Sequence, residues 1–140
     1  MTRYSLLLLI SVVAGLAFSP CTAQVVHLDA GYQRVNEEAA KYSLRLQPAG
    51  EGAFTGRLLS DDGAVIFEGR YIPWKNTYIE DGLFTFFYPD GKIESSGSYE
   101  RGARTGVWKR YQPDGSARPN RFYPPEGAAS LRRVLGIDQG

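Results

Sequence analysis

Short apolar-rich segments separated by glycine-containing turns follow one another through most of this chain beyond residue 24, and some of them alternate apolar and polar residues with a period of two. In residues 42–46, for example, the side chains of Tyr42, Leu44 and Leu46 fall on one face and polar side chains fall on the other. This period is typical of strands with one buried face. It predicts strands over residues 25–28, 42–46, 54–60, 64–71, 83–88, 93–99 and 107–111, with an edge strand near 121–123.

Two short helices are also expected. Asn36 is followed by Glu37 and Glu38, so it suits the N-cap of one or two helical turns that end near residue 40. Near the C-terminus, a Pro-Pro pair at 124–125 predicts the start of a helix over residues 126–135, and Gly136 is expected to end it.

Three Asp-Gly pairs lie between neighbouring strand candidates. They are Asp62-Gly63, Asp90-Gly91 and Asp114-Gly115, and a proline precedes the last two. Asp-Gly is favoured in hairpins because the turn requires positive φ and because the aspartate can accept a hydrogen bond from its own backbone. Each pair therefore predicts a hairpin tip.

A 24-residue echo relates residues 82–91 to residues 106–115. Each copy has a first glycine, aromatic residues at the third and sixth positions, and a closing Pro-Asp-Gly. The residues expected to hold the repeat together are Gly82, Phe84, Phe87, Asp90, Gly91, Gly97, Tyr99, Gly106, Trp108, Tyr111, Asp114 and Gly115. Such self-similarity indicates a unit that buries its apolar face by stacking on copies of itself. A third copy is degraded, with Arg121 and Tyr123 at the places of Gly97 and Tyr99.

The first copy is irregular, and residues 72–81 link it to the second. This link contains Trp74 and Tyr78, which the repeat does not predict. Because surface loops tolerate insertions and often carry binding residues, both are candidate partner-binding residues. The alternative is that Trp74 folds over the open end of the sheet core.

Aromatic residues three positions apart in a regular strand face opposite sides of the sheet. Trp108 and Tyr111 therefore share a face only if the strand bulges. Otherwise both faces are partly apolar and two covers are needed, one from the lead-in with residues 42–46 and one from the C-terminal tail. If one cover is missing, the exposed row becomes the partner site.

The N-terminus is typical of a secretory signal peptide. Residues 1–3 carry one positive charge, residues 6–18 are apolar, and small residues precede an expected cleavage after Ala23. A lipid anchor on Cys21 is the less favoured alternative, because Pro20 and Phe18 fit that motif poorly. The expected organisation is a signal peptide (1–23), a lead-in (24–52), hairpin repeats (53–123) and a tail (124–140), exported to the periplasm or secreted.

Charge is balanced overall, at a formal net charge of +1, but not along the chain. Residues 24–96 hold seven Lys or Arg against eleven Asp or Glu, and residues 97–140 hold eight against four. We expect another envelope protein as the partner, with an anionic membrane surface in contact with the basic half as a second candidate. Nucleic acid is not expected for an exported chain of balanced charge.

The sequence offers few residues suited to catalysis. The one histidine, His27, lies near the expected mature N-terminus, and removal of Cys21 with the leader would leave no thiol. No metal site, cofactor-binding site or catalytic residue is predicted. Glu68, Glu94 and Glu100 on neighbouring strands are the carboxylates that a glycoside hydrolase could use. The acidic pairs 61–62 and 80–81, each followed by glycine, are interpreted as turns rather than calcium loops.

The spacing Gly-x-aromatic-x-x-aromatic-x-x-Asp-Gly, followed by Gly-x-Tyr, resembles the bacterial MORN repeat variant family over residues 54–123. The resemblance implies an all-β fold, an elongated antiparallel sheet of consecutive hairpins, with no reaction of its own. With the leader, it indicates a non-enzymatic binding or scaffolding module of the cell envelope. The alternatives are a small envelope hydrolase that uses sheet carboxylates and an antitoxin or immunity-like protein, a role given to some members of the family.

Overall fold

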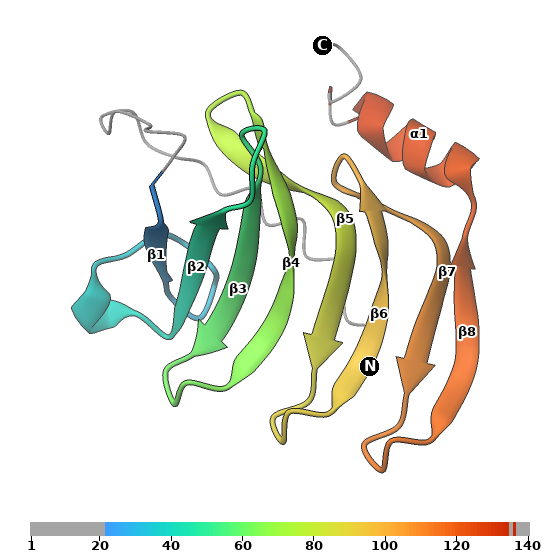
Figure 1. The fold of residues 1–140 in the computed structure, drawn as a ribbon, viewed down its shortest axis with the longest axis horizontal. Coiled ribbons are helices and arrows are strands. Elements are labelled where there is room, and N and C mark those ends of the chain that lie inside the picture. Colours follow the sequence, from blue (N-terminus) through green and yellow to red (C-terminus); the bar gives the residue numbers. More distant parts are fainter. Residues whose placement is uncertain (1–21, 135, 137–140) are drawn as a thin grey trace.

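The computed structural model describes residues 22–134 and residue 136. In this part of the chain, eight strands form one antiparallel sheet in which each strand pairs with the next in the sequence (Figure 1). The strands are β1 (Gln24–Leu28), β2 (Tyr42–Pro48), β3 (Phe54–Ser60), β4 (Val65–Trp74), β5 (Thr77–Phe87), β6 (Ile93–Glu100), β7 (Ala103–Tyr111) and β8 (Ala117–Tyr123). The predicted all-β sheet of consecutive hairpins is confirmed.

Both short helices are present. The 3-10 helix η1 (Glu37–Ala39) is capped by Asn36, whose side chain accepts a hydrogen bond from the backbone N–H of Ala39 at 3.3 Å. The helix α1 (Pro125–Val134) follows β8 and packs against β7 near the end of the sheet (Figure 1). Its Ala128 is buried, and Arg132 forms an ion pair with Glu100 of β6 at 3.6 Å.

The three hairpin tips at the Asp-Gly pairs share one geometry, as the sequence predicts. The three glycines have φ between 85° and 89°, a conformation that glycine adopts without strain. Each aspartate carboxylate accepts a hydrogen bond from the backbone N–H two residues later, at distances from 2.8 to 3.2 Å. Hydrogen bonds from the hydroxyls of Ser60 and Ser116, followed by these backbone bonds, lower the pKa of Asp62 and Asp114, and the backbone bond from Lys92 lowers the pKa of Asp90. The side chains therefore stay ionised at neutral pH.

A second repeated feature packs an aromatic ring of one strand against a glycine of the strand before it. Tyr71 lies over Gly56, Phe84 over Gly69 and Trp108 over Gly97, so that each ring rests on a glycine of the preceding strand. A Cβ added at any of these glycines would come within 2.3 to 2.4 Å of a ring carbon. Glycine is required here by the close approach of the ring rather than by φ.

These rings define one face of the sheet, which we call the aromatic face. Its buried members form a single core that runs from Val26 of β1 to Trp108 of β7. The rings of Tyr71, Phe84, Tyr99 and Trp108 meet their neighbours mostly edge to face, at centroid distances of 4.9 to 5.4 Å. This is the arrangement that the ring quadrupoles favour.

Two expectations about the sheet are corrected. The lead-in strand β2 pairs with β3 in the same sheet, so residues 42–46 extend the aromatic face instead of covering it. The link over residues 72–81 is not an inserted loop, because Pro73 pairs with Tyr78 and Trp74 with Thr77 across the β4–β5 hairpin. The extra residues of the first repeat unit therefore lengthen strands β4 and β5 and do not form a surface loop.

The sequence left open whether aromatics three apart share a face. Phe84 lies on the aromatic face, and its neighbour Phe86 contacts Phe67 and Trp108 there. Arg57 and Glu68 alternate along their strands with buried residues of the aromatic face, so they lie on the opposite face. Phe87 lines a groove together with these two residues and therefore lies on that opposite face too. Both faces of the sheet thus carry apolar side chains. We call the second one the outer face.

Candidate functional site

Aromatic residues of the second and third repeat units form a cage around Arg104. The guanidinium carbon lies 4.3 Å from the ring centroid of Trp108 and 5.5 to 5.8 Å from those of Phe86, Tyr99 and Tyr123. Its Nε donates to the hydroxyl of Tyr99 at 3.1 Å, and its Nη1 to that of Tyr123 at 3.2 Å. Cation–π attraction and these two hydrogen bonds hold the charge in place.

Glu80 takes the equivalent position in the preceding unit, 24 residues earlier. It pairs with Tyr71 across β4 and β5, as Arg104 pairs with Tyr99 across β6 and β7. Glu80 is 7% exposed, and burial raises the pKa of its carboxyl to about 7, against the partial opposing effect of Arg104. The buried hydroxyl of Tyr71 has no hydrogen-bond partner within the described residues. A carboxyl and a phenol are thus buried side by side with few polar contacts, which is uncommon in proteins.

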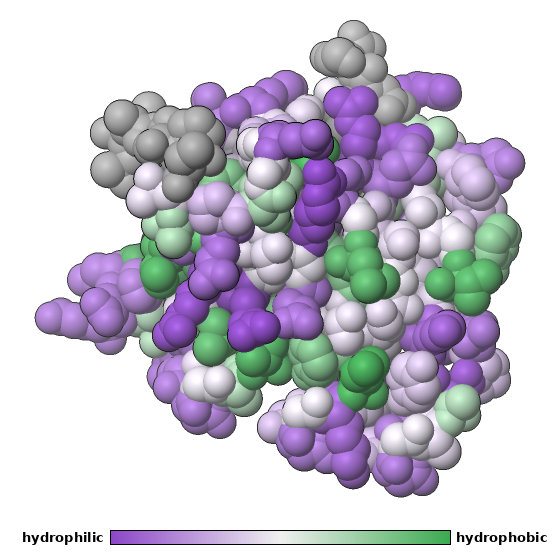
Figure 2. Space-filling view, in the orientation of Figure 1, coloured by the Kyte–Doolittle hydropathy of each residue, from purple (hydrophilic) through white to green (hydrophobic). Residues whose placement is uncertain are grey.

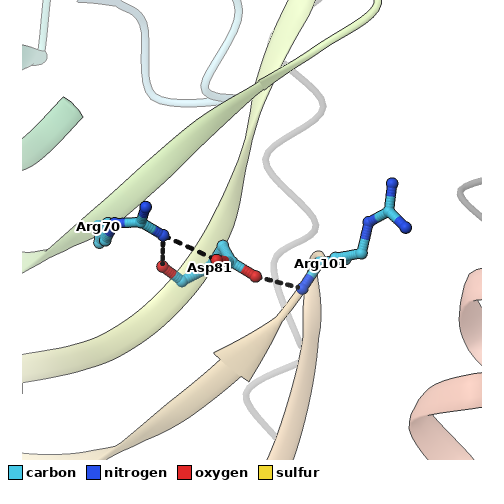
Figure 3. Close-up of polar contacts among 3 residues, drawn as sticks. All are labelled: Arg70, Asp81 and Arg101. Atoms are coloured by element: carbon cyan, nitrogen blue, oxygen red, sulfur yellow. Dashed lines mark hydrogen bonds and ion pairs between the residues drawn. The ribbon is translucent and has the colours of Figure 1, made fainter. Parts of the chain in front are cut away.

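Asp81 ties the β4–β5 pair to the next hairpin (Figure 3). Its carboxylate forms an ion pair with Nη1 of Arg70 at 2.8 Å and accepts a hydrogen bond from the backbone N–H of Arg101 at 3.1 Å. The backbone N–H of Gly102 donates to the carbonyl of Glu80 at 2.7 Å. The expected turn over residues 80–82 is therefore wrong, because these residues lie within β5.

The outer face carries an exposed apolar row. Leu83 of β5 is 63% exposed, Val107 of β7 is 56% exposed and Phe122 of β8 is 64% exposed. Val107 and Phe122 are directly paired, and the exposed Ser98 of β6 pairs with Leu83. Figure 2 shows this face, with separate green side chains over β5 to β8 among pale and purple ones. We call Leu83, Val107 and Phe122 the outer row.

The two aromatics predicted to contact a partner lie in different environments. Tyr78 is 6% exposed and its ring meets that of Phe54 edge to face at 5.0 Å, so it belongs to the core. Trp74 is half-buried near the hairpin turn of β4 and β5, and Nζ of Lys75 lies 4.4 Å from the centre of its ring. Only Trp74 of this pair offers a partly accessible ring.

A groove of about 410 Å³ lies between the β3–β4 tip and the β5–β6 tip. Its lining includes Arg57 and Glu68, which form an ion pair at 2.9 Å, together with Ala64, Phe87 and Asp90. The groove lies at the tip end of the sheet, since its lining includes residues of the β3–β4 and β5–β6 tips. It is lined by both apolar and acidic side chains.

The carboxylates considered for hydrolysis are not assembled into one site. Glu68 is engaged with Arg57 on β3, and Glu100 lies at the end of β6 against Arg132 of α1. Glu94 lies near the other end of β6, where the β5–β6 register shifts. His27 lies in β1, the first strand of the sheet, and pairs with Ser43. Among the described residues, no group of three or more His, Cys, Asp or Glu side chains is placed to hold a metal ion.

Sequence reasoning missed Glu80 and Arg104 as partners of the aromatic repeat. The signal that could have found them is the same 24-residue offset, which places both two residues before a repeat glycine, Gly82 or Gly106. The adjacent acidic residues and the glycine made residues 80–82 resemble a turn, and residues 104–106 fell before the predicted strand 107–111. The same repeat position therefore carries an acidic residue, Glu80, in one unit and a basic residue, Arg104, in the next.

The leader and Cys21 fall outside the described residues, so their interpretation stays a prediction. Within residues 22–134, no helix is long and apolar enough to cross a membrane. Comparison of the chain with protein-family models, with curated proteins and with solved structures found no match.

Proposed function

We propose that this chain is a non-enzymatic binding or scaffolding module of the bacterial cell envelope, built from MORN-like hairpin repeats. The observation that carries the proposal is the outer row, three large apolar side chains each more than half exposed on one face of the sheet. Exposed apolar side chains gathered on one face are a common mark of protein interaction surfaces. The leader-like N-terminus supports a location in the envelope.

The partner is a protein whose surface combines apolar side chains with acidic ones. Lys109 is exposed two residues beyond Val107 on β7, and the C-terminal part of the chain carries the excess of positive charge. Acidic groups around an apolar patch would complement this charge and would raise the association rate at low salt.

The test begins with the tagged chain, expressed from residues 1–140 in a Gram-negative host, and with the proteins that it retains from envelope extracts. A retained protein is then purified, and its affinity is measured by calorimetry for the wild type and for the triple variant Leu83→Ser, Val107→Ser, Phe122→Ser. We expect the triple variant to lose at least about tenfold in affinity, because each truncated contact at the centre of an interface costs on the order of 1 kcal/mol or more.

Val25→Ser is the matched control, since Val25 is 52% exposed on β1, far along the sheet from the outer row. Equal affinity of the triple variant and the wild type would contradict the proposed surface. Loss of an activity on Glu68→Gln, Glu94→Gln or Glu100→Gln, with partner binding unchanged, would favour the hydrolase instead.

A further inference from the structure

The three hairpin tips project from one end of the sheet and leave two gaps between them (Figure 1). The first gap lies between the β3–β4 and β5–β6 tips, and the second lies between the β5–β6 and β7–β8 tips. Because the tips share one turn geometry, corresponding positions in the two gaps can be compared directly. The offset is 28 residues from the first tip to the second and 24 residues from the second to the third, as the glycines Gly63, Gly91 and Gly115 show.

The second gap is bridged by two side chains of the β5–β6 tip. The hydroxyl of Tyr88 donates a hydrogen bond to the carbonyl of Tyr111 at 2.9 Å. Nζ of Lys92 donates to the carbonyl of Pro113 at 3.2 Å. A tyrosine and a lysine four residues apart thus join this tip to the next one.

The first gap lacks both bridging side chains. Ser60 stands in the place of Tyr88 and Ala64 in the place of Lys92. The Ser60 hydroxyl bonds within its own turn, to the carboxylate of Asp62 and to the carbonyl of Ala64. The groove of about 410 Å³ lies here, lined by Arg57, Ala64, Glu68, Phe87, Pro89 and Asp90 among others. Small residues at the two bridging positions account for this open space.

The acceptors that the bridge would use are retained in the first gap. Phe87 and Pro89 take the places of Tyr111 and Pro113, and no side chain of the described residues donates a hydrogen bond to either carbonyl.

Two of the three aspartates on the flanking tips have a cationic partner, since the carboxylate of Asp61 lies 3.8 Å from Nζ of Lys41 and that of Asp90 lies 3.5 Å from Nζ of Lys92. The exposed Asp62 forms hydrogen bonds only within its own turn and has no ion pair within the described residues, so its charge favours a cation. The groove combines two backbone acceptors with a rim that is acidic at Asp62.

We infer that this groove is the docking site for a hairpin tip of another protein that presents a tyrosine and a lysine at the spacing of Tyr88 and Lys92. The tyrosine hydroxyl donates to the carbonyl of Phe87, and the lysine ammonium donates to the carbonyl of Pro89 beside the acidic rim. A second copy of this chain is the less suitable occupant, because its own Tyr88 and Lys92 already bridge its second gap. The inference rests on the proposed binding function and adds a second contact surface to the outer row.

The test uses a cyclic hairpin peptide with the sequence of residues 86–93, Phe-Phe-Tyr-Pro-Asp-Gly-Lys-Ile. It is titrated into the isotope-labelled protein, expressed from residues 1–140, and amide shifts are followed by NMR. We expect shifts at the two tips that line the groove. A control peptide with phenylalanine for the tyrosine and leucine for the lysine should bind at least about tenfold more weakly, because it lacks both donors. Equal binding of the two peptides would overturn the inference.

Ala64→Lys places in the first gap the side chain that fills the second, so it should close the groove and weaken peptide binding at least about tenfold. Ala64→Ser leaves the groove open and should bind as the wild type does. Thermal melting checks that both variants fold. If Ala64→Lys melts at a lower temperature, Asp62→Asn decides instead. It removes the rim charge that has no ion pair within the described residues, and it keeps a side-chain oxygen that can accept from the backbone N–H of Ala64, so it should weaken binding without loss of fold.

Two outcomes separate this inference from the proposed function. If Ala64→Lys binds the peptide like the wild type while the outer-row variant loses its partner, the groove assignment is wrong and the binding function stands. If the chain alone self-associates in sedimentation experiments and Ala64→Lys abolishes the association, the occupant is a second copy, which would overturn the assignment to another protein.

Discussion

The two tryptophans of the chain lie in opposite environments. Trp108 is 1% exposed, rests on Gly97, stacks with the Arg104 guanidinium, and donates from Nε1 to the carbonyl of Ser98 at 3.2 Å. Trp74 is half-buried near a hairpin turn. We expect Trp108→Ala to lower the free energy of unfolding by about 3 to 5 kcal/mol and Trp74→Ala by about 1 kcal/mol or less. Urea denaturation followed by circular dichroism measures both, and equal losses would contradict the cage.

Glu80 gives the stability a pH dependence of a definite sign. Its pKa is about 7 in the folded protein and 4.5 as the reference value, so between these values the folded state holds a proton that the unfolded state has lost. Stability therefore falls as pH rises from about 4.5 to 7, by roughly 3 kcal/mol, and changes no further above that range. The aspartates of the tips act oppositely, but only at lower pH, because their pKa values are lowered.

Denaturation curves at pH 5 and pH 8 measure this effect. Glu80→Gln should remove most of the difference between the two, because glutamine does not titrate. Glu68→Gln is the control, since Glu68 lies in a solvent-exposed ion pair and should leave the difference nearly intact. The raised pKa of Glu80 would be contradicted if the wild type were more stable at pH 8 than at pH 5 and if Glu80→Gln showed the same difference between the two pH values as the wild type.

At the residue scale, the sequence predicted what local chemistry determines. Asp90-Gly91 and its equivalents are turns because backbone conformation and a short-range hydrogen bond decide them. The pairing of Glu80 with Tyr71 depends on the register between two strands, which no local signal in residues 80–82 reports. The same holds for the enclosure of Arg104 by rings from β5, β6, β7 and β8.

The hairpin tips are the element on which the glycine conformations can be tested. Gly91 and Gly115 have φ of 85° and 89°, and a Cβ at either would meet no atom within 4 Å. The cost of substitution is therefore conformational: Gly91→Val or Gly115→Val should destabilise the protein by roughly 1 to 3 kcal/mol. Asp61→Ala, at an exposed turn position without this φ, should cost far less. Equal shifts in melting temperature for all three variants would argue against the turn assignment.

Strand ends show why element prediction was partial. β3 and the tip-side ends of the other hairpins fall within a few residues of the predicted bounds, and α1 lies where the Pro-Pro pair and Gly136 place it. The repeat pattern predicts that strands begin just after Gly82 and Gly106, whereas β5 begins at Thr77 and β7 at Ala103. Both glycines have positive φ, of 116° and 66°, and both lie where the register shifts, so they are bulges inside strands. A glycine in the sequence does not distinguish a bulge from a break.

Across the whole molecule, the sheet has a chemical reason to stop at β8. In β3, β4 and β6, a glycine receives the ring of the next strand, whereas the corresponding position of β8 carries Arg121. If a ninth strand paired with β8 in the same way, its aromatic ring would overlap the Arg121 side chain. β8 also contains Pro119, which has no N–H to offer to a neighbour. Both features protect an edge that could otherwise recruit another chain.

Restoring the repeat pattern at this edge should therefore promote association. We expect the double variant Arg121→Gly, Pro119→Thr to form larger species than the wild type in a concentration-dependent manner. The threonine would supply a backbone N–H for pairing, and the glycine would leave space for an aromatic ring of a further strand. Sedimentation velocity at several concentrations measures the change. Arg121→Lys keeps a long charged side chain and should sediment like the wild type. If the double variant also sediments like the wild type across the concentration range, Arg121 and Pro119 do not end the array, and the limit must come from the packing of α1 against β7.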